Sequence, residues 1–275
     1  MPEGDTIHRH ARELGTRFGG RAITRLLRGG VAEPRYAGAE LVAADAIGKH
    51  LVLRFVRSGE AEPDVLLVRV HLGIAGGWRT GPLARFSLLQ RSAAPLLLDF
   101  GDTLALVHKP KEIVLERAGL ADKRPLTALG PDLLGPAPDL DEVLRRARVA
   151  TYAAAPLGEL LLDQRVAAGI GNVYKSEVCF LECLHPFLRV DEVDDATLRR
   201  SYERAIVLLG QNLGSWRRTT TADRSRDKLP ARGQGRYWVY GRDRRPCYTC
   251  GTVITRRVMG PDLRSTFFCG TCQAP

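Results

Sequence analysis

Residues 160–180, LLLDQRVAAGIGNVYKSEVCF, combine two apolar helical patterns with a glycine-rich junction. The apolar spacing on both sides of residues 168–171 predicts two helices joined by a turn, with Asn172 at the N-cap position of the second. Glycines let a ligand approach the backbone, and a helix N-terminus attracts phosphate. The segment therefore predicts either a phosphate-binding turn or a packed helical hairpin with an asparagine cap. It is no dinucleotide fingerprint, because no strand precedes it and the third glycine is absent.

Helical patterns continue on both sides of this segment, and a Pro-rich and Gly-rich stretch at 121–140 separates them from a different pattern upstream. The upstream part has short runs rich in Val, Leu and Ile, divided by turn clusters such as RSGEAEPD, GDT and RTGPLA, which is typical of a sandwich or barrel. The predicted helices cover residues 140–152, 158–167, 172–184 and 194–214, and the predicted strands cover 21–27, 40–47, 50–56, 64–72, 95–100, 103–108 and 112–116.

The chain opens MPEGDT, and two interpretations of this start remain open on the residues alone. Proline and acidic residues suit the first turn of a helix, so the stretch predicts an ordinary helix start. Removal of Met1 would also leave Pro2 as a free secondary amine. The helix that follows ends at two glycines, and its apolar face consists of Ile7, Ala11, Leu14 and Phe18.

Charge and hydropathy narrow the class of protein. Lys and Arg outnumber Asp and Glu by 41 to 31, and the net charge of +10 favours a polyanionic partner such as nucleic acid. The basic excess is concentrated in residues 217–245. A hydrophobic content of 44% indicates a globular chain, and the sequence has neither a membrane-spanning run nor a signal-peptide pattern. We therefore expect a cytoplasmic protein.

The tail carries two C-x-x-C pairs, CYTC and CGTC, separated by eighteen residues. Four thiolates at this spacing can surround one structural Zn²⁺ with no open coordination position, and this prediction is preferred to two disulfides or a redox pair in a cytoplasmic chain. Cys179 and Cys183 lie four apart on a predicted helix and are interpreted as buried thiols. The predicted zinc ligands are Cys247, Cys250, Cys269 and Cys272.

A β-hairpin is predicted between the two cysteine pairs, with Arg264 at or near its tip and Phe267 and Phe268 towards the metal. An arginine in that place can make charge-assisted hydrogen bonds to phosphate, but it also fits a solvated surface position.

The order of these motifs resembles the formamidopyrimidine-DNA glycosylase and endonuclease VIII family, and MPEGDT is closer to the endonuclease VIII branch. The resemblance extends over nearly the whole chain. Its motifs are PEG at the start, GKHL at 48–51, VHLGIAGGW at 70–78, LGPDLL at 129–134, DQRVAAGIGNVYKSE at 163–177, VYGR at 239–242 and the four-cysteine finger ending TFFCGTCQ.

The resemblance implies an α+β, multidomain fold that binds damaged double-stranded DNA in a cleft between its two main domains. The implied domains are a β-sandwich with an N-terminal helix over 1–122, a helix-two-turn-helix domain over 123–236 and a β-hairpin zinc finger over 237–275. It further implies a monomeric, nucleoid-associated bacterial enzyme.

By the same resemblance, Pro2 matches the nucleophile, Glu3 the general acid and Lys49 the second catalytic amine. Asn172 and Arg264 match the residues that grip the phosphates beside the damaged nucleotide. His71 and Ile74 fall in the loop that resembles the wedge into the gap left by an extruded base, and Thr219, Thr220 and Thr221 are candidate contacts to the lesion.

The implied activity is excision of an oxidised base through a Schiff base, followed by β,δ-elimination. Thr6 stands where many relatives have a second glutamate, so no proton relay is assigned to it. HLGIAGGW lacks an arginine beside the wedge residue, and HKPKEIV at 108–114 lacks the arginine and aromatic of purine-lesion enzymes. These departures favour oxidised pyrimidines as the bases that are removed. The alternatives are an oxidised-purine glycosylase and a non-catalytic zinc-finger DNA-binding protein.

Overall fold

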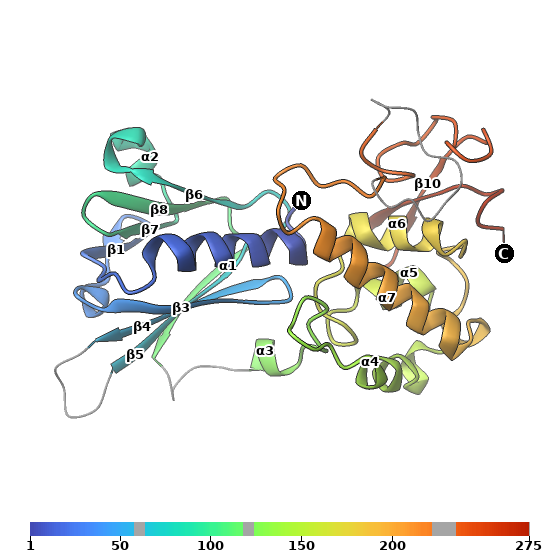
Figure 1. Ribbon diagram of the computed structural model, residues 1–275, viewed down its shortest axis with the longest axis horizontal. Helices are drawn as coiled ribbons and strands as arrows, with labels where there is room; N and C mark the ends of the chain where they lie inside the picture. Colours follow the sequence, from blue (N-terminus) through green and yellow to red (C-terminus); the bar gives the residue numbers. More distant parts are fainter. Residues whose placement is uncertain (58–63, 118–123, 222–234, 275) are drawn as a thin grey trace. The chain divides into compact units, whose positions relative to one another are not determined.

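A computed structural model describes residues 1–57, 64–117, 124–221 and 235–274. The chain divides into two compact units, Met1–Thr127 and Ala128–Pro275, and each is described by itself. Figure 1 shows a helix between sheets in the first unit and a helical bundle with a β-hairpin in the second. Among the described residues, no helix has both the length and the apolar character needed to span a membrane.

Unit 1 contains two antiparallel sheets, with strand orders β3-β4-β5-β9 and β2-β1-β7-β8-β6. Inward-facing side chains of both sheets form one core, which confirms the predicted sandwich. The strands are β1 (Arg25–Arg28), β2 (Val31–Ala32), β3 (Glu40–Ile47), β4 (His50–Arg57), β5 (Asp64–His71), β6 (Gly77–Pro82), β7 (Leu96–Asp99), β8 (Thr103–His108) and β9 (Glu112–Arg117). The short helices are η1 (Pro34–Tyr36), η2 (Leu83–Arg85), α2 (Leu88–Ser92) and α3 (Arg124–Thr127).

Strand β6 contradicts the sequence prediction, because RTGPLA was expected to form a turn. Residues 77–82 instead pair with β8 in continuous antiparallel register. Proline cannot donate to a central ladder but is tolerated on an edge strand, and β6 is an edge of its sheet. Gly81 leaves room for the Arg85 side chain, since a Cβ there would lie 2.7 Å from Arg85 Cδ.

Helix α1 (Gly4–Phe18) lies along both sheets of unit 1, and its four predicted apolar positions are all buried. Gly15 packs against Ala44 of β3, while Arg17 Nη1 donates to Thr80 Oγ1 of β6 over 2.5 Å. The chain after the helix joins the start of β3, where Gly20 N donates to Leu41 O. The N-terminus of α1 therefore points towards the end of the sheet at which β3 turns into β4.

Unit 2 is built around α6 (Asn172–Leu181), in which every residue is buried. The other helices are α4 (Leu140–Ala147), η3 (Ala150–Tyr152), α5 (Leu157–Leu162), η4 (Val190–Glu192) and α7 (Asp195–Gln211). The predicted hairpin forms between β10 (Thr255–Met259) and β11 (Arg264–Phe268). Helix α6 packs against α5, α7 and β11, so the hairpin rests on the central helix of the unit.

The glycine-rich junction before α6 is held by the segment that follows α3. Gly130 N donates to Gln164 O over 2.8 Å, and Leu133 N donates to Ala168 O over 3.1 Å. A short parallel bridge joins Asp132 to Ala168. These bonds hold residues 164–168, which precede Asn172, in place.

Candidate functional site

The start of the chain forms the cap of α1. Pro2 is half-buried, and Glu3 is the N-cap residue with an exposed fraction of 1%. The main-chain oxygen of Glu3 accepts from Thr6 N over 2.9 Å. The first residues of the chain thus sit at the positive end of the α1 dipole, and the Glu3 carboxyl lies in the interior.

Lys49 occupies the two-residue turn between β3 and β4, which the pair Ile47–His50 closes. Gly48 before it has a φ of +58°, as a tight hairpin turn requires. Lys49 is half-buried, and this turn lies at the end of the sheet towards which the N-terminus of α1 points.

His50, His71 and Glu112 form a row across β4, β5 and β9 at the same end of the sheet. The two imidazole rings are 4.9 Å apart, and with Lys111 the three side chains line an open pocket of about 300 Å³. Burial, with the nearby charges of Lys49 and Lys111, lowers the pKa of both histidines to about 4. Among the residues that line the pocket, the positive charge at neutral pH therefore comes from Lys111.

Ile74 lies in the turn after β5, and 66% of its surface is exposed. Gly73 has a φ of +67°, and a Cβ there would lie 2.9 Å from Lys111 Cβ. The turn thus presents an apolar side chain to solvent close to the histidine pocket.

In unit 2, Asn172 is the first residue of α6, whereas Gly171 occupies the predicted cap position. Its Nδ2 donates to Ser265 O over 2.7 Å, which brings the start of α6 beside the β11 residue that follows Arg264. Arg264 begins β11 and donates to Asp262 over 3.0 Å. The two predicted phosphate-binding residues therefore lie at or beside the contact between Asn172 of α6 and Ser265 of β11. We call this contact the joint between α6 and the hairpin.

The basic segment 217–245 is described in part, and Arg224, Arg226, Lys228 and Arg232 lie outside the described residues. Arg242 is 6% exposed, donates to Pro246 O over 2.7 Å and lies over the Tyr248 ring, so it supports the fold of the tail. Thr220 is fully buried and donates to Glu177. The prediction that Thr220 contacts a lesion is therefore wrong, whereas Thr219 and Thr221 stay candidates.

Glu177 was missed from the sequence, although it connects three parts of unit 2. Its buried carboxylate accepts from the main-chain N–H groups of Trp238 at 2.8 Å, Val239 at 2.9 Å and Tyr240 at 2.8 Å. Burial raises the pKa of Glu177, and the hydrogen bonds oppose that rise. Lys175 was missed as well. The available signal was two charged residues, a lysine and a glutamate, inside a helix with an apolar pattern.

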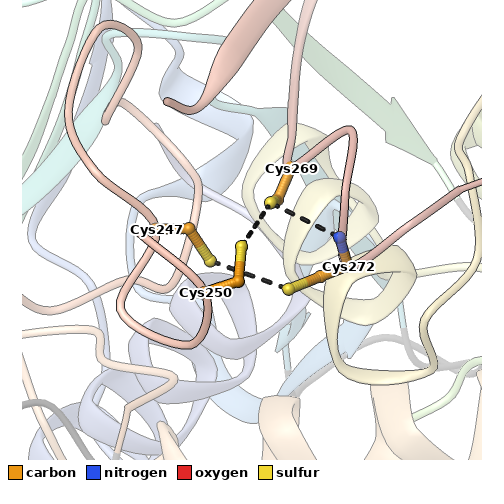
Figure 2. A group of neighbouring side chains, drawn as sticks. All are labelled: Cys247, Cys250, Cys269 and Cys272. Carbon is orange, nitrogen blue, oxygen red and sulfur yellow. Dashed lines mark hydrogen bonds between the residues drawn. The ribbon is translucent and has the colours of Figure 1, made fainter. Parts of the chain in front are cut away.

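The four cysteines of the tail converge on one point (Figure 2). Their sulfur atoms all lie within 4.8 Å of one another, with 3.9 Å from Cys247 to Cys272 and 3.4 Å from Cys250 to Cys269. These distances bracket the edge of about 3.8 Å expected for a tetrahedron with metal–sulfur bonds near 2.3 Å, and they exceed a disulfide bond. The cluster can therefore hold a metal ion.

The remaining two cysteines differ from each other, which corrects part of the prediction. Cys179 is buried in α6, and burial raises the pKa of its thiol to about 12. Cys183 is exposed, because α6 ends at Leu181 and the chain turns there with a φ of +58°. Neither residue belongs to the four-cysteine cluster.

Comparison with known proteins places the fold and its junction in one family. Residues 129–222 match the formamidopyrimidine-DNA glycosylase H2TH domain. The chain is 37% identical to "Probable endonuclease 8 2" of Streptomyces coelicolor, over 100% of this chain and 94% of the relative. It is 36% identical to "DNA-(apurinic or apyrimidinic site) lyase Nei2" of Mycolicibacterium smegmatis, over 99% of both chains.

Solved structures agree with this relationship. The MutM (Fpg) protein of Thermus thermophilus superposes with a TM-score of 0.73 at 29% identity, covering 99% of this chain and 98% of the other. The Lactococcus lactis Fpg, solved with DNA that contains an abasic site, shares the fold at a TM-score of 0.76 and 21% identity over the full length of both chains. The chain belongs to the formamidopyrimidine-DNA glycosylase and endonuclease 8 family of bifunctional DNA glycosylases and lyases.

Proposed function

We propose that this enzyme removes oxidised bases, pyrimidines in particular, from double-stranded DNA and cleaves the strand at the resulting abasic site. The observation that carries the proposal is the full-length similarity to proteins named endonuclease 8 and DNA-(apurinic or apyrimidinic site) lyase. The buried acid, the half-buried amines and the exposed apolar turn of unit 1 supply the groups that such a reaction needs.

Pro2 is the proposed nucleophile. Loss of Met1 frees its secondary amine, which attacks C1′ of the deoxyribose while the bond to the base breaks. The nitrogen lone pair then forms an iminium with the opened sugar. The positive end of α1 favours the neutral, nucleophilic form of the amine.

Glu3 and Lys49 are the proposed proton-transfer groups. Glu3 is buried beside Pro2 and, as the acid, protonates the sugar ring oxygen or the departing base. The iminium acidifies the C2′ protons, so a base can remove one and expel the 3′ phosphate, and a second elimination expels the 5′ phosphate. Lys49 is an amine in the turn towards which the N-terminus points, and it shuttles these protons or holds a phosphate.

The DNA contacts follow from the need to extrude the damaged nucleotide. Extrusion costs a few kcal/mol, which a damaged pair reduces. Ile74, as an exposed apolar side chain, fills the gap in the stack, and His71 lies beside it. Asn172 and Arg264 grip the flanking phosphates from the joint between α6 and the hairpin.

Zinc is the proposed metal of the four-cysteine cluster. Four thiolates whose sulfur atoms all lie within 4.8 Å of one another suit tetrahedral Zn²⁺, which would supply structural support and leave no position for a catalytic water. The cysteines hold the base of the hairpin that carries Arg264.

Four labelled duplexes test the substrate assignment: thymine glycol, dihydrouracil, 8-oxoguanine opposite cytosine and a plain abasic site. We expect incision of the two pyrimidine lesions and the abasic site, with both 3′ and 5′ phosphate ends. A clear preference for 8-oxoguanine opposite cytosine would overturn the pyrimidine assignment. Binding to all four duplexes without incision of any would support the non-catalytic alternative.

A further inference from the structure

Lys175 occupies a position that disfavours a lysine. Its side chain is fully buried in the N-terminal turn of α6. Lysine is almost never fully buried unless it is paired, and a cation at the positive end of a helix dipole destabilises the helix. Its contacts must therefore compensate for a cost that a smaller apolar residue would avoid.

The ammonium of Lys175 connects α6 to β11. It donates to Asn172 Oδ1 over 2.7 Å and to Thr266 Oγ1 over 2.6 Å, and it lies 3.5 Å from Ser265 O. Thr266 is fully buried as well. Helix and hairpin are thus joined through a group that donates hydrogen bonds only.

This contact determines which way the Asn172 amide faces. Because an ammonium has no acceptor, the amide must turn its oxygen towards Lys175 and its nitrogen away from it. Asn172 Nδ2 accordingly donates to Ser265 O over 2.7 Å. The amide nitrogen has a second N–H, and in this orientation a phosphate meets a donor. With the amide reversed, a phosphate would meet the carbonyl oxygen instead.

We propose that Lys175 is a positioning residue that fixes the Asn172 amide in its phosphate-donating orientation. The inference rests on the proposed function, since it assumes that Asn172 binds DNA phosphate. Lys175 touches neither the reacting sugar nor the base in this account, and it acts through Asn172.

A double-mutant cycle tests this role. The probe is a duplex carrying a tetrahydrofuran abasic analogue, and its dissociation constant is measured for wild type, Asn172→Ala, Lys175→Met and the double variant. We expect each single substitution to weaken binding about tenfold, the loss of one charge-assisted hydrogen bond. The double variant should bind within twofold of Asn172→Ala, because Lys175 has no route to the phosphate without Asn172.

Two further variants keep the test decisive. Val178→Ala removes buried surface from the same helix without touching the joint, so it measures the effect of lost stability on binding. Thr266→Val removes the second ammonium acceptor at constant shape; if Lys175→Met alone does not fold, the two substitutions are combined in the cycle, so that no buried hydroxyl is left without its donor. If the loss of affinity in the double variant equals the product of the two single losses, the proposal is overturned. The proposal would also be overturned if Val178→Ala had the same melting temperature as Lys175→Met and bound the abasic duplex as weakly. A wild-type protein that does not prefer the abasic analogue over intact duplex would count against the proposed function instead.

Discussion

Histidines with lowered pKa values are a feature of unit 1 at the scale of single residues. His10 on α1 is 3% exposed, and burial, with the charges of Arg9 and His108, lowers its pKa to about 4. His50 and His71 have similarly lowered pKa values. The folded unit therefore keeps these imidazoles neutral at a pH at which the unfolded chain binds protons.

The stability of unit 1 should accordingly depend on pH. A lowered folded-state pKa gives stability that is complete above pH 6.5 and is lost as the pH falls towards 4. His10 alone accounts for about 3 kcal/mol of this loss. Hydrogen exchange of α1 peptides between pH 7 and pH 4.5 would measure it. His10→Gln should flatten the dependence, and an unchanged slope in that variant would contradict the assignment.

Hydrogen bonds between residues far apart in the chain could not be predicted from the sequence. Glu177 bonds to residues 238–240, Lys175 to Thr266 and Thr220 to Glu177. Each pair is fixed by tertiary packing that no local periodicity records. Thr220 was therefore expected at a lesion, although its hydroxyl supports the interior.

At the scale of elements, the segment 129–134 explains how the junction before α6 keeps its shape. Its backbone lies so close to residues 164–168 that a Cβ on Gly130 would be 2.1 Å from Val166 O. Only a residue without a side chain fits there. The LGPDLL motif thus packs against the junction that precedes Asn172.

Gly130→Ala should destabilise unit 2 by about 3 kcal/mol, because the contact is with backbone that cannot move aside. Gly210 on α7 is the matched control, since a Cβ there has no neighbour within 4 Å. Gly210→Ala should be neutral or stabilising by up to about 1 kcal/mol through helix propensity. Urea denaturation of both variants provides the comparison. Equal stability of the two variants would show that the backbone contact is not this close.

The structure of the β10–β11 hairpin should depend on the four-cysteine cluster at its base. Removing the metal should release one zinc ion per chain and loosen β10 and β11, which lowers affinity for abasic duplex. Cys250→Ser should reproduce this effect without a chelator. Metal analysis and binding before and after chelation are the measurements. A protein that contains no metal and binds with unchanged affinity would contradict the zinc assignment.

Elements with a strong local pattern were predictable, and those without one were not. The buried face of α1, the main strands of the sandwich and the pairing of the two C-x-x-C turns all follow from periodicity or spacing. Strand β6 was missed because Gly81 and Pro82 are turn residues that an edge strand tolerates. Cys183 was placed on a helix that in fact ends two residues earlier.

At the scale of the whole molecule, each unit carries part of the proposed machinery. Pro2, Glu3 and Lys49 belong to unit 1, whereas Asn172 and Arg264 belong to unit 2. The net charge of +10 favours association with DNA but gives no chemistry. The proposed function therefore assigns catalysis to residues of the first unit and phosphate binding to residues of the second. The division into three domains at residues 122 and 236 stays a prediction.

The most direct test of the account is borohydride trapping on a duplex with a plain abasic site, followed by mass mapping of the cross-linked peptide. We predict a covalent adduct on Pro2 in protein that has lost Met1, and its loss in the Pro2→Gly variant. An adduct that maps to Lys49, persists in Pro2→Gly or does not form with correctly processed protein would contradict the assignment of Pro2 as the nucleophile.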